Sequence, residues 1–251
     1  MGAERLTERK SILILGVRVD NLTQAEALAR IETFLQSRRP HQVVTINPEF
    51  VVAAQRDGEF AGVLQEADLN LPDGQGVVWA ARLLGTPVRE RVTGVDTLLG
   101  MAELAAHRGY KLFLLGGAPG VAEEASQRLQ GTYAGLRVVG TYAGTPAPEE
   151  ENEIVKRIRQ AQPDILWVAY WAPQQDLWIH RHLHRLEVPV AMGVGGALDF
   201  IAGRARRAPQ WMQRLGLEWL HRLVHQPWRW RRMLALPYFV WLVLTRRATH
   251  G

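Results

Sequence analysis

The hydrophobic positions of the chain form short runs, and stretches with a different spacing separate them. Each run is rich in β-branched residues and short enough for one strand. Between most runs, apolar residues recur at the three- and four-residue spacing of an amphipathic helix. The predicted strands are 12–15, 43–46, 67–71, 111–115, 136–140, 164–170 and 189–194. The predicted helices are 23–38, 94–108, 119–130, 149–161 and 174–186.

This alternation predicts an α/β fold class. We expect a Rossmann-like domain in which a mostly parallel sheet carries helices on both faces. Ligands of such sheets bind at the carboxyl ends of the strands, where the chain enters the next helix. Candidate chemistry is therefore expected directly after each apolar run.

The last part of the chain differs in composition from the rest. From Gly203 onward there are ten arginines, no lysine and one acid, which gives +9, whereas the whole chain carries +5 and the first 202 residues carry −4. Five of the nine tryptophans also lie there. We predict a Rossmann-like body over residues 1–203 and a basic, tryptophan-rich helical appendage over residues 204–251.

Two absences narrow the function classes. The sequence has no cysteine, which excludes disulfides, thiolate metal sites and a cysteine nucleophile. Its first 16 residues lack the long apolar core of a signal peptide, so we expect a cytoplasmic protein.

Two loops after predicted strands are rich in glycine. Gly116 and Gly117 follow one strand, and Gly195 and Gly196 follow another. Such glycines let backbone N–H groups approach a phosphate, but they also form ordinary tight turns. Neither loop has the GxGxxG spacing of a dinucleotide site, which argues against an NAD-dependent oxidoreductase.

Polar residues end two further strands. Thr45 and Asn47 follow one, and Asp73 follows another between a proline and a glycine. An acid held on a rigid turn at this edge is placed as a general base would be. The same residue would also serve as a helix cap or in an Asx-turn, and both interpretations remain open.

A fourth loop offers Gln174, Gln175 and Asp176 after a strand, either to contact a ligand or to cap the next helix. His180 and His184 follow at helical spacing, but there is no HExxH pattern, so a solvated basic face is favoured over a zinc site. No Asp-x-Asp pair is present to hold a divalent cation on a diphosphate.

The appendage contains 13 uncharged residues, Met233 to Thr245. As a helix they span roughly 20 Å, whereas crossing a bilayer takes about 20 residues and roughly 30 Å. Flanking arginines and tryptophans favour a helix lying on a membrane surface over an oligomer interface or a nucleic-acid site. Arg222, Arg229 and Arg232 would share a helical face, interrupted by Pro227, that suits an anionic diphosphate.

Taken in order, the motifs resemble those of the WecG/TagA/CpsF glycosyltransferases. The resemblance runs from about residue 12 to residue 235. It rests on Thr45-x-Asn47-Pro48-Glu49, "LPDG" (71–74), "RVTGVD" (91–96), "LLGG" (114–117), "APQQD" (172–176), "GVGGALDFIAG" (193–203), "RAP" (207–209) and "GLEWLHRL" (216–223).

The resemblance implies an inverting transferase at the cytoplasmic membrane face. It would move an N-acetylmannosamine-type sugar from a UDP donor to N-acetylglucosamine on undecaprenyl diphosphate, in wall teichoic acid or other surface polysaccharide synthesis. The resemblance also implies that no metal cofactor takes part and that the membrane surface is a partner. We expect no nucleic-acid partner, and a homo-oligomer is compatible with the apolar appendage.

Site residues follow from the resemblance position by position. Asp73 would be the base, with Thr45 and Asn47 beside it, while Gln175 and Asp199 would contact the UDP. Arg222, Arg229 and Arg232 would steady the diphosphate. Gly116, Gly117, Gly195 and Gly196 complete the predicted substrate-binding set.

One segment departs from the family pattern. Where the family commonly has Gly-x-Pro-Lys-Gln-Glu, this chain has Trp171-Ala172-Pro173-Gln174-Gln175-Asp176. The departure leaves the donor sugar open. A nucleotide- or nucleic-acid-binding module without catalysis is the alternative function.

Overall fold

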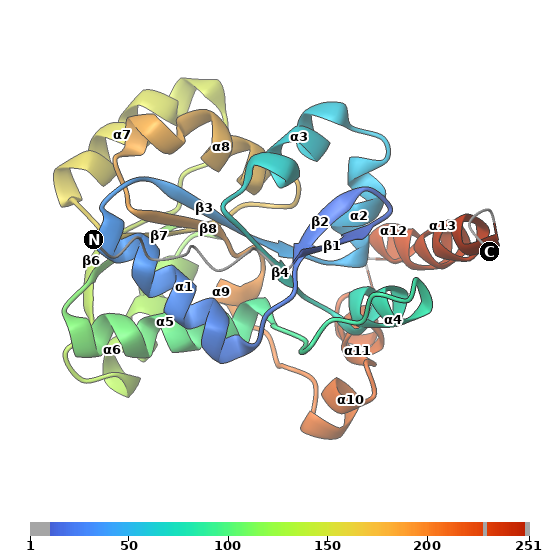
Figure 1. Cartoon of the computed structure of the whole chain (residues 1–251). Coiled ribbons are helices and arrows are strands. Elements are labelled where there is room, and N and C mark those ends of the chain that lie inside the picture. The colour runs from blue at the N-terminus through green and yellow to red at the C-terminus, as the bar shows by residue number, and fades with distance from the viewer. Residues whose placement is uncertain (1–10, 228–229, 249–251) are drawn as a thin grey trace, which may run out of the picture.

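Residues 11–227 and 230–248 are described by a computed structural model of the chain (Figure 1). Six parallel strands form one sheet in the order β4-β3-β8-β7-β5-β6. This confirms the predicted Rossmann-like class. The strands are β3 (His41–Ile46), β4 (Leu69–Pro72), β5 (Lys111–Gly116), β6 (Arg137–Tyr142), β7 (Ile165–Ala169) and β8 (Val190–Gly193).

Helices cover both faces of the sheet, as Figure 1 shows. One layer consists of α1 (Gln24–Ser37), α5 (Gly94–Arg108), α6 (Val121–Thr132) and α9 (Ala197–Ile201). The other contains α2 (Pro48–Ala54), α3 (Gly58–Glu66), α7 (Pro148–Ala161) and α8 (Gln174–Leu186), and α4 (Gln75–Leu83) packs with α2 and α3. A capping box begins α1, because Thr23 and Glu26 exchange hydrogen bonds.

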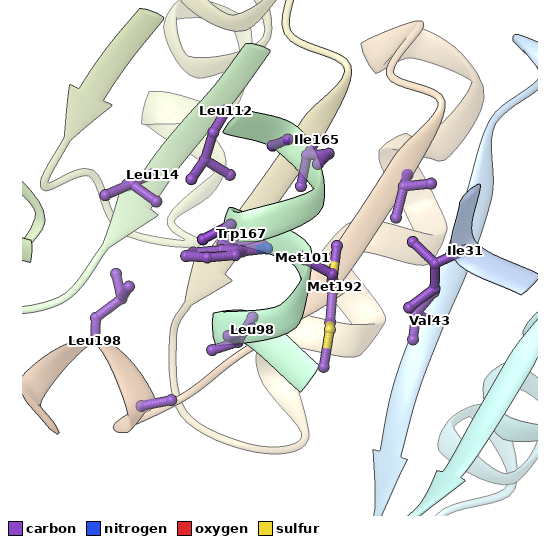
Figure 2. Close-up of a cluster of buried hydrophobic side chains, with 14 of the residues drawn as sticks. Ile31, Val43, Leu98, Met101, Leu112, Leu114, Ile165, Trp167, Met192 and Leu198 are labelled. Atoms are coloured by element: carbon purple, nitrogen blue, oxygen red, sulfur yellow. The ribbon is translucent and has the colours of Figure 1, made fainter. Parts of the chain in front are cut away.

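The core on the α1 and α5 side is built around strand residues that face away from water. Trp167 on β7 and Met192 on β8 are fully buried beside Leu98 and Met101 of α5 (Figure 2). Because both faces of the sheet are covered in this way, the strands read as continuous apolar runs rather than alternating ones.

One predicted strand has a different role from the one expected. Residues 12–15 do not join the parallel sheet; β1 (Ser11–Ile14) pairs antiparallel with β2 (Val17–Asp20). Leu15 and Gly16 both have positive φ, which is the geometry of a two-residue hairpin turn. Asp20 then accepts a hydrogen bond from the Asn70 N–H over 2.7 Å, which fastens the hairpin to β4.

Four helices have no counterpart in the sequence prediction: α2, α3, α4 and α9. They have at most nine residues each, and one to three residues separate each from the strand or helix before it. Such short segments show too few turns for a helical period to stand out.

The appendage is helical, as predicted, and contains α10 (Gln210–Arg214), α11 (Glu218–His225), α12 (Trp230–Met233) and α13 (Ala235–Ala248). α13 packs on α2 and α4. Its Phe239 and Val243 are buried in the core cluster of α2 and α3, while Val240, Trp241 and Leu244 are exposed. Thus one face of this helix belongs to the body and the other faces solvent.

Candidate active site at the carboxyl edge of the sheet

The carboxyl ends of neighbouring strands bring the predicted polar residues together. β3 and β4 pair in parallel with Thr45 opposite Leu71. The chain turns directly after both strands, and the Asp73 N–H donates to the Ile46 carbonyl over 2.8 Å. Thr45, Asn47 and Asp73 line one cavity of about 110 Å³, closed on another side by the end of β8. We call this the central cavity.

Asp73 lies against the start of α5. A Cβ on Gly94 would be 3.5 Å from Asp73 Oδ2 and 3.4 Å from Thr45 Cγ2. Burial raises the pKa of the Asp73 carboxyl to about 6, while Arg222 and the backbone N–H of Gly94 oppose a larger rise. Such a carboxylate is ionised at neutral pH and accepts a proton more readily than an ordinary aspartate.

The alternative role of Asp73 as a helix cap does not occur. The N-cap of α4 is Gly74, and no side chain caps that helix. Asn47, by contrast, is a cap: its Oδ1 accepts from the Phe50 N–H over 3.1 Å at the start of α2. The Asn47 side chain thus fixes α2 while also lining the central cavity.

Two arginines of the appendage reach the central cavity. Arg222 on α11 lies with its guanidinium 4.6 Å from the ring centroid of Phe200. Arg232 on α12 donates to Glu49 Oε2 over 2.6 and 2.9 Å. The structure therefore brings both to the cavity that Asp73 lines, although they belong to different helices. Arg229, the third predicted arginine, lies outside the described residues.

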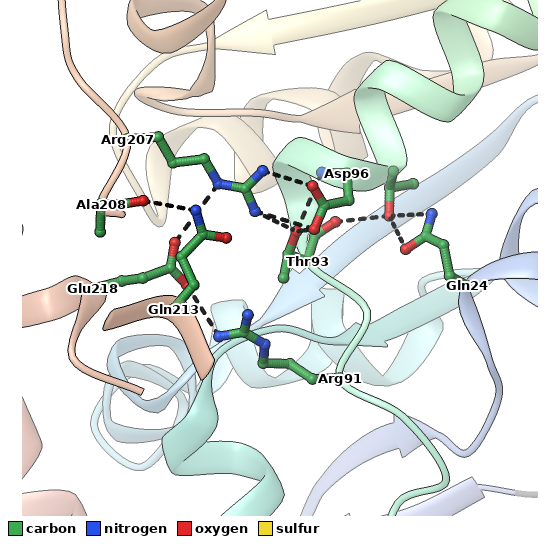
Figure 3. Close-up of polar contacts among 9 residues, drawn as sticks. Gln24, Arg91, Thr93, Asp96, Arg207, Ala208, Gln213 and Glu218 are labelled. Atoms are coloured by element: carbon green, nitrogen blue, oxygen red, sulfur yellow. Dashed lines mark hydrogen bonds and ion pairs between the residues drawn. The ribbon is translucent and has the colours of Figure 1, made fainter. Parts of the chain in front are cut away.

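Ion pairs fasten α11 to the body beside this site (Figure 3). Arg91 donates to Glu218 over 3.0 Å. Glu218 lies one helical turn before Arg222 on α11. Arg207 donates to both oxygens of Asp96 over 2.6 and 3.0 Å and lies 3.8 Å from Glu218. Burial alone would raise the pKa of Asp96, but the hydrogen bonds from Arg207 and Thr93 bring it below its ordinary value. We call these four residues, Arg91, Asp96, Arg207 and Glu218, the latch.

A second cavity, of about 310 Å³, adjoins the central one and is called the flanking cavity. Arg232 lines both. Three of the four predicted loop glycines line the flanking cavity together with Asp199 and Trp171: Gly117, Gly195 and Gly196. The side chain of Trp171 is 59% exposed, which leaves a large aromatic face available to a ligand.

Gly116 has a backbone role instead. Its φ is +88°, and a Cβ there would lie 2.8 Å from the Ala169 carbonyl oxygen. Only glycine fits this close approach of β5 to the end of β7, so the tight-turn interpretation of this residue is the one observed.

Gln175 lies beneath the glycine loop rather than on an open surface. It is 3% exposed, and its Oε1 accepts from the Gly195 N–H over 2.9 Å. Asp176 is fully buried, and burial raises its pKa to about 7, against the opposing effect of Gln175. Neither caps α8, whose N-cap is Pro173.

The histidines of α8 have separate partners. His182 is buried, with Nδ1 2.8 Å from the Trp178 carbonyl and Nε2 3.2 Å from Glu151. His180 lies 3.6 Å from Glu66. Within residues 11–227 and 230–248, no three histidine or acidic side chains gather as a metal site would require.

Comparison with known proteins decides the family. The family model described as "Glycosyl transferase WecG/TagA/CpsF family" matches residues 12–251. This chain belongs to that family. The observed site agrees with membership, because the motifs at 45–49, 71–74, 91–96 and 193–203 all contribute residues to the central cavity.

Three relatives share the name N-acetylglucosaminyldiphosphoundecaprenol N-acetyl-beta-D-mannosaminyltransferase. The protein of Bacillus spizizenii is 34% identical over 212 residues, 84% of this chain and 82% of the relative. That of Bacillus subtilis (strain 168) is 34% identical over 202 residues, 80% of this chain and 78% of the relative. That of Staphylococcus aureus (strain MW2) is 31% identical over 245 residues, 97% and 96% of the two chains. The chain is thus a glycosyltransferase.

Residues that the sequence did not single out complete the site of this glycosyltransferase. Gly94 packs on Asp73, Phe200 lies under Arg222, and Arg91 with Glu218 holds α11. Gly94, Arg91 and Phe200 lie within quoted motifs, but nothing in their spacing shows which side chain they contact. As for the appendage, no helix in the described part of the chain has the length and apolarity to cross a membrane.

Proposed function

We propose that this glycosyltransferase moves an N-acetylmannosamine-type sugar from UDP to N-acetylglucosaminyl-diphospho-undecaprenol, with inversion at the anomeric carbon. The observation that carries the proposal is Asp73, a carboxyl with a pKa raised to about 6 in the central cavity beside Arg222. The names of the relatives supply the sugar and the acceptor.

Asp73 acts as the general base. Its carboxylate takes the proton of the acceptor hydroxyl while that oxygen forms a bond to the anomeric carbon of the donor sugar. The bond from that carbon to the UDP oxygen breaks, and UDP leaves with the electron pair. A single displacement of this kind inverts the anomeric centre. Thr45 and Asn47 line the same cavity and would orient the acceptor sugar.

Arginines take the part that a metal ion plays in other sugar transferases. Arg222 and Arg232 line the central cavity, and guanidinium groups pair with phosphate oxygens through two parallel hydrogen bonds. Their charge stabilises the diphosphate as it leaves. Arg229 is proposed as the third member, and we expect no metal requirement.

The nucleotide part of the donor is placed in the flanking cavity. Gly117, Gly195 and Gly196 offer close backbone approach to phosphates there, and Asp199 would contact the UDP. Gln175 supports this site from below through its hydrogen bond to Gly195. The exposed ring of Trp171 is suited to stack on the uracil base.

The appendage would bring this site to the inner face of the cell membrane. Among the described residues, the large exposed apolar side chains gather after Gly203, apart from Leu13, Trp79 and Trp171. They are Trp211, Leu215, Trp219, Leu220, Val224, Trp230, Leu234, Val240, Trp241 and Leu244. Apolar patches beside arginines bind the interface of anionic membranes. The product would serve wall teichoic acid or another surface polysaccharide.

The test uses a panel of UDP-sugars with N-acetylglucosamine on a short-chain prenyl diphosphate, and measures UDP release with and without EDTA. We expect UDP-N-acetylmannosamine to be the preferred donor and EDTA to have no effect. Asp73→Asn should reduce turnover at least a thousandfold while UDP still binds. Normal turnover by this variant would remove Asp73 as the base, and release of UDP only with an unrelated sugar would overturn the donor assignment.

A further inference from the structure

A further cavity, with a largely apolar lining, adjoins the site and is distinct from the central and flanking cavities. It has a volume of about 440 Å³ and runs between α2 and α13. We call it the α2–α13 groove. Phe50, Ala172 and Arg232 line both this groove and the central cavity, so the two spaces adjoin.

The walls of the groove have a composition suited to an apolar chain with an anionic end. Ala53 and Phe60 line one wall, and Ala235 and Tyr238 of α13 line the other. Arg232 lies where the groove meets the central cavity, and its partner Glu49 is the one acid among the described lining residues. Arg56 lies with its guanidinium 4.8 Å from the ring centroid of Tyr238.

The groove also borders the exposed apolar surface of the appendage. Leu234 lines the groove and is 58% exposed. It precedes α13, whose outer face carries Trp241 and Leu244. A chain lying in the groove therefore passes from an arginine at the active site to the surface proposed to contact lipid. The volume is in the range of cavities that hold small ligands, but it fits only the first units of a long prenyl chain.

We propose that the α2–α13 groove binds the first isoprene units of a polyprenyl diphosphate, with its diphosphate at Arg232. This assignment rests on the proposed function, in which the acceptor sugar occupies the central cavity next to Asp73. The diphosphate follows the sugar in such an acceptor, and the prenyl chain follows the diphosphate. The groove gives that chain an apolar path out of the active site.

Direct binding tests the groove without relying on turnover. Isothermal titration of the full chain with farnesyl diphosphate is compared with inorganic diphosphate. We expect the prenyl compound to bind at least tenfold more tightly, because only it fills the groove. Ala53→Trp and Ala235→Trp fill the groove from opposite walls, and each should remove this preference while leaving diphosphate binding in place. Ala134→Trp, at an exposed turn after α6, is the matched control and should behave like the parent.

Turnover provides the second readout. With the groove filled, the KM for a prenyl-diphosphate acceptor should rise at least tenfold, while the KM for the UDP-sugar stays within twofold. Circular dichroism and the unfolding temperature establish whether each variant folds. Because the two substitutions lie on opposite walls, one variant still tests the groove if the other does not fold.

The outcomes separate the two proposals. Equal binding of farnesyl diphosphate and inorganic diphosphate by the parent, or an unchanged preference in both folded groove variants, would overturn the groove. Selective farnesyl diphosphate binding by a protein that transfers no sugar would uphold the groove and overturn the proposed function. Sugar transfer that does not depend on the prenyl chain would uphold the proposed function and overturn the groove.

Discussion

At the scale of single residues, the site depends on one carboxyl whose surroundings disfavour its charge. Asp73 is half-buried beside Gly94 and Thr45, and the partial removal of its carboxyl from water raises its pKa to about 6, despite Arg222 nearby. A base of this strength suits a hydroxyl that loses its proton only as the new bond forms. The end of β4 explains where Asp73 lies, and the packing around the Asp73 side chain explains its raised pKa.

The pH dependence of the reaction follows from that pKa. As pH falls through about 6, Asp73 becomes protonated and cannot accept the acceptor's proton, so kcat/KM should fall tenfold per pH unit below that value. A profile measured from pH 4.5 to 8.5 checks this. A flat profile down to pH 4.5 would contradict an essential Asp73 carboxylate with a raised pKa.

Stability should change in the opposite direction to activity. The folded pKa of Asp73 lies above its ordinary value of 3.8, so its stabilising contribution is present below about pH 4 and is lost as pH rises through about 6. Asp73→Asn removes the free-energy cost of the ionised Asp73 carboxylate in the folded protein. We expect it to be up to about 2–3 kcal/mol more stable than the parent at pH 7, with no difference at pH 4. Denaturant unfolding at both pH values measures this.

At the scale of elements, α11 is held by charge rather than by a buried face. No described residue of α11 is fully buried, whereas Glu218 in its first turn pairs with Arg91 over 3.0 Å. Arg222 is one turn further on and faces Phe200 and the central cavity. Thus the ion pairs of the latch hold the helix that carries Arg222 against the body.

Glu218→Gln tests Glu218 as a positioning residue. The loss of a partly exposed ion pair costs about 1 kcal/mol or less, so the unfolding temperature should change little. We expect kcat to fall at least tenfold, and the acid limb of the pH profile to move upward, because Arg222 retreats from Asp73.

A purely electrostatic role of Glu218 would give a different result. Glu218 itself raises the Asp73 pKa, so its removal with α11 in place would move the acid limb downward and leave kcat intact. Glu153→Gln, which removes the exposed pair with Arg157 on α7, is the matched control and should alter neither quantity.

At the scale of the whole molecule, the appendage packs into the core of the body and also lines the central cavity. Phe239 on α13 is 1% exposed, and its ring lies 3.8 Å from a Cβ placed on Gly76 of α4. The opposite face of α13 carries Trp241, which is 56% exposed. α13 therefore stabilises the body through one face and carries part of the proposed membrane-binding surface on the other.

Two substitutions separate these faces. Phe239→Ala should lower the free energy of unfolding by about 3–5 kcal/mol, because it leaves a cavity in the core. Trp241→Ala should change stability by less than about 1 kcal/mol but weaken binding to anionic liposomes severalfold. Denaturant unfolding and liposome sedimentation measure the two effects. Equal loss of stability in both variants would contradict the division of α13 into two faces.

Truncation after Gly203 extends this prediction. Composition alone predicts a soluble, folded body of low activity, because the appendage differs so clearly from the rest in charge. Phe239 and Val243 of α13 are buried in the core cluster of α2 and α3. Removal of α13 exposes part of this core, so we expect the truncated body to be less stable as well. A truncated chain with the parent's unfolding temperature would show that α13 contributes little to the body.

Local sequence patterns were enough to predict the class of the fold, five of its long helices, the appendage and the polar residues Thr45, Asn47 and Asp73 at the carboxyl edge of the sheet. These follow from local periodicity, composition and the rule that parallel sheets bind ligands at one edge. The hairpin of residues 11–20, the short helices and the finding that Asp73 does not cap α4 depended on tertiary structure. So did the meeting of Arg222 and Arg232 with residues more than 100 positions earlier. Contacts between distant segments fix burial, pKa and the walls of a cavity, and no local pattern encodes them.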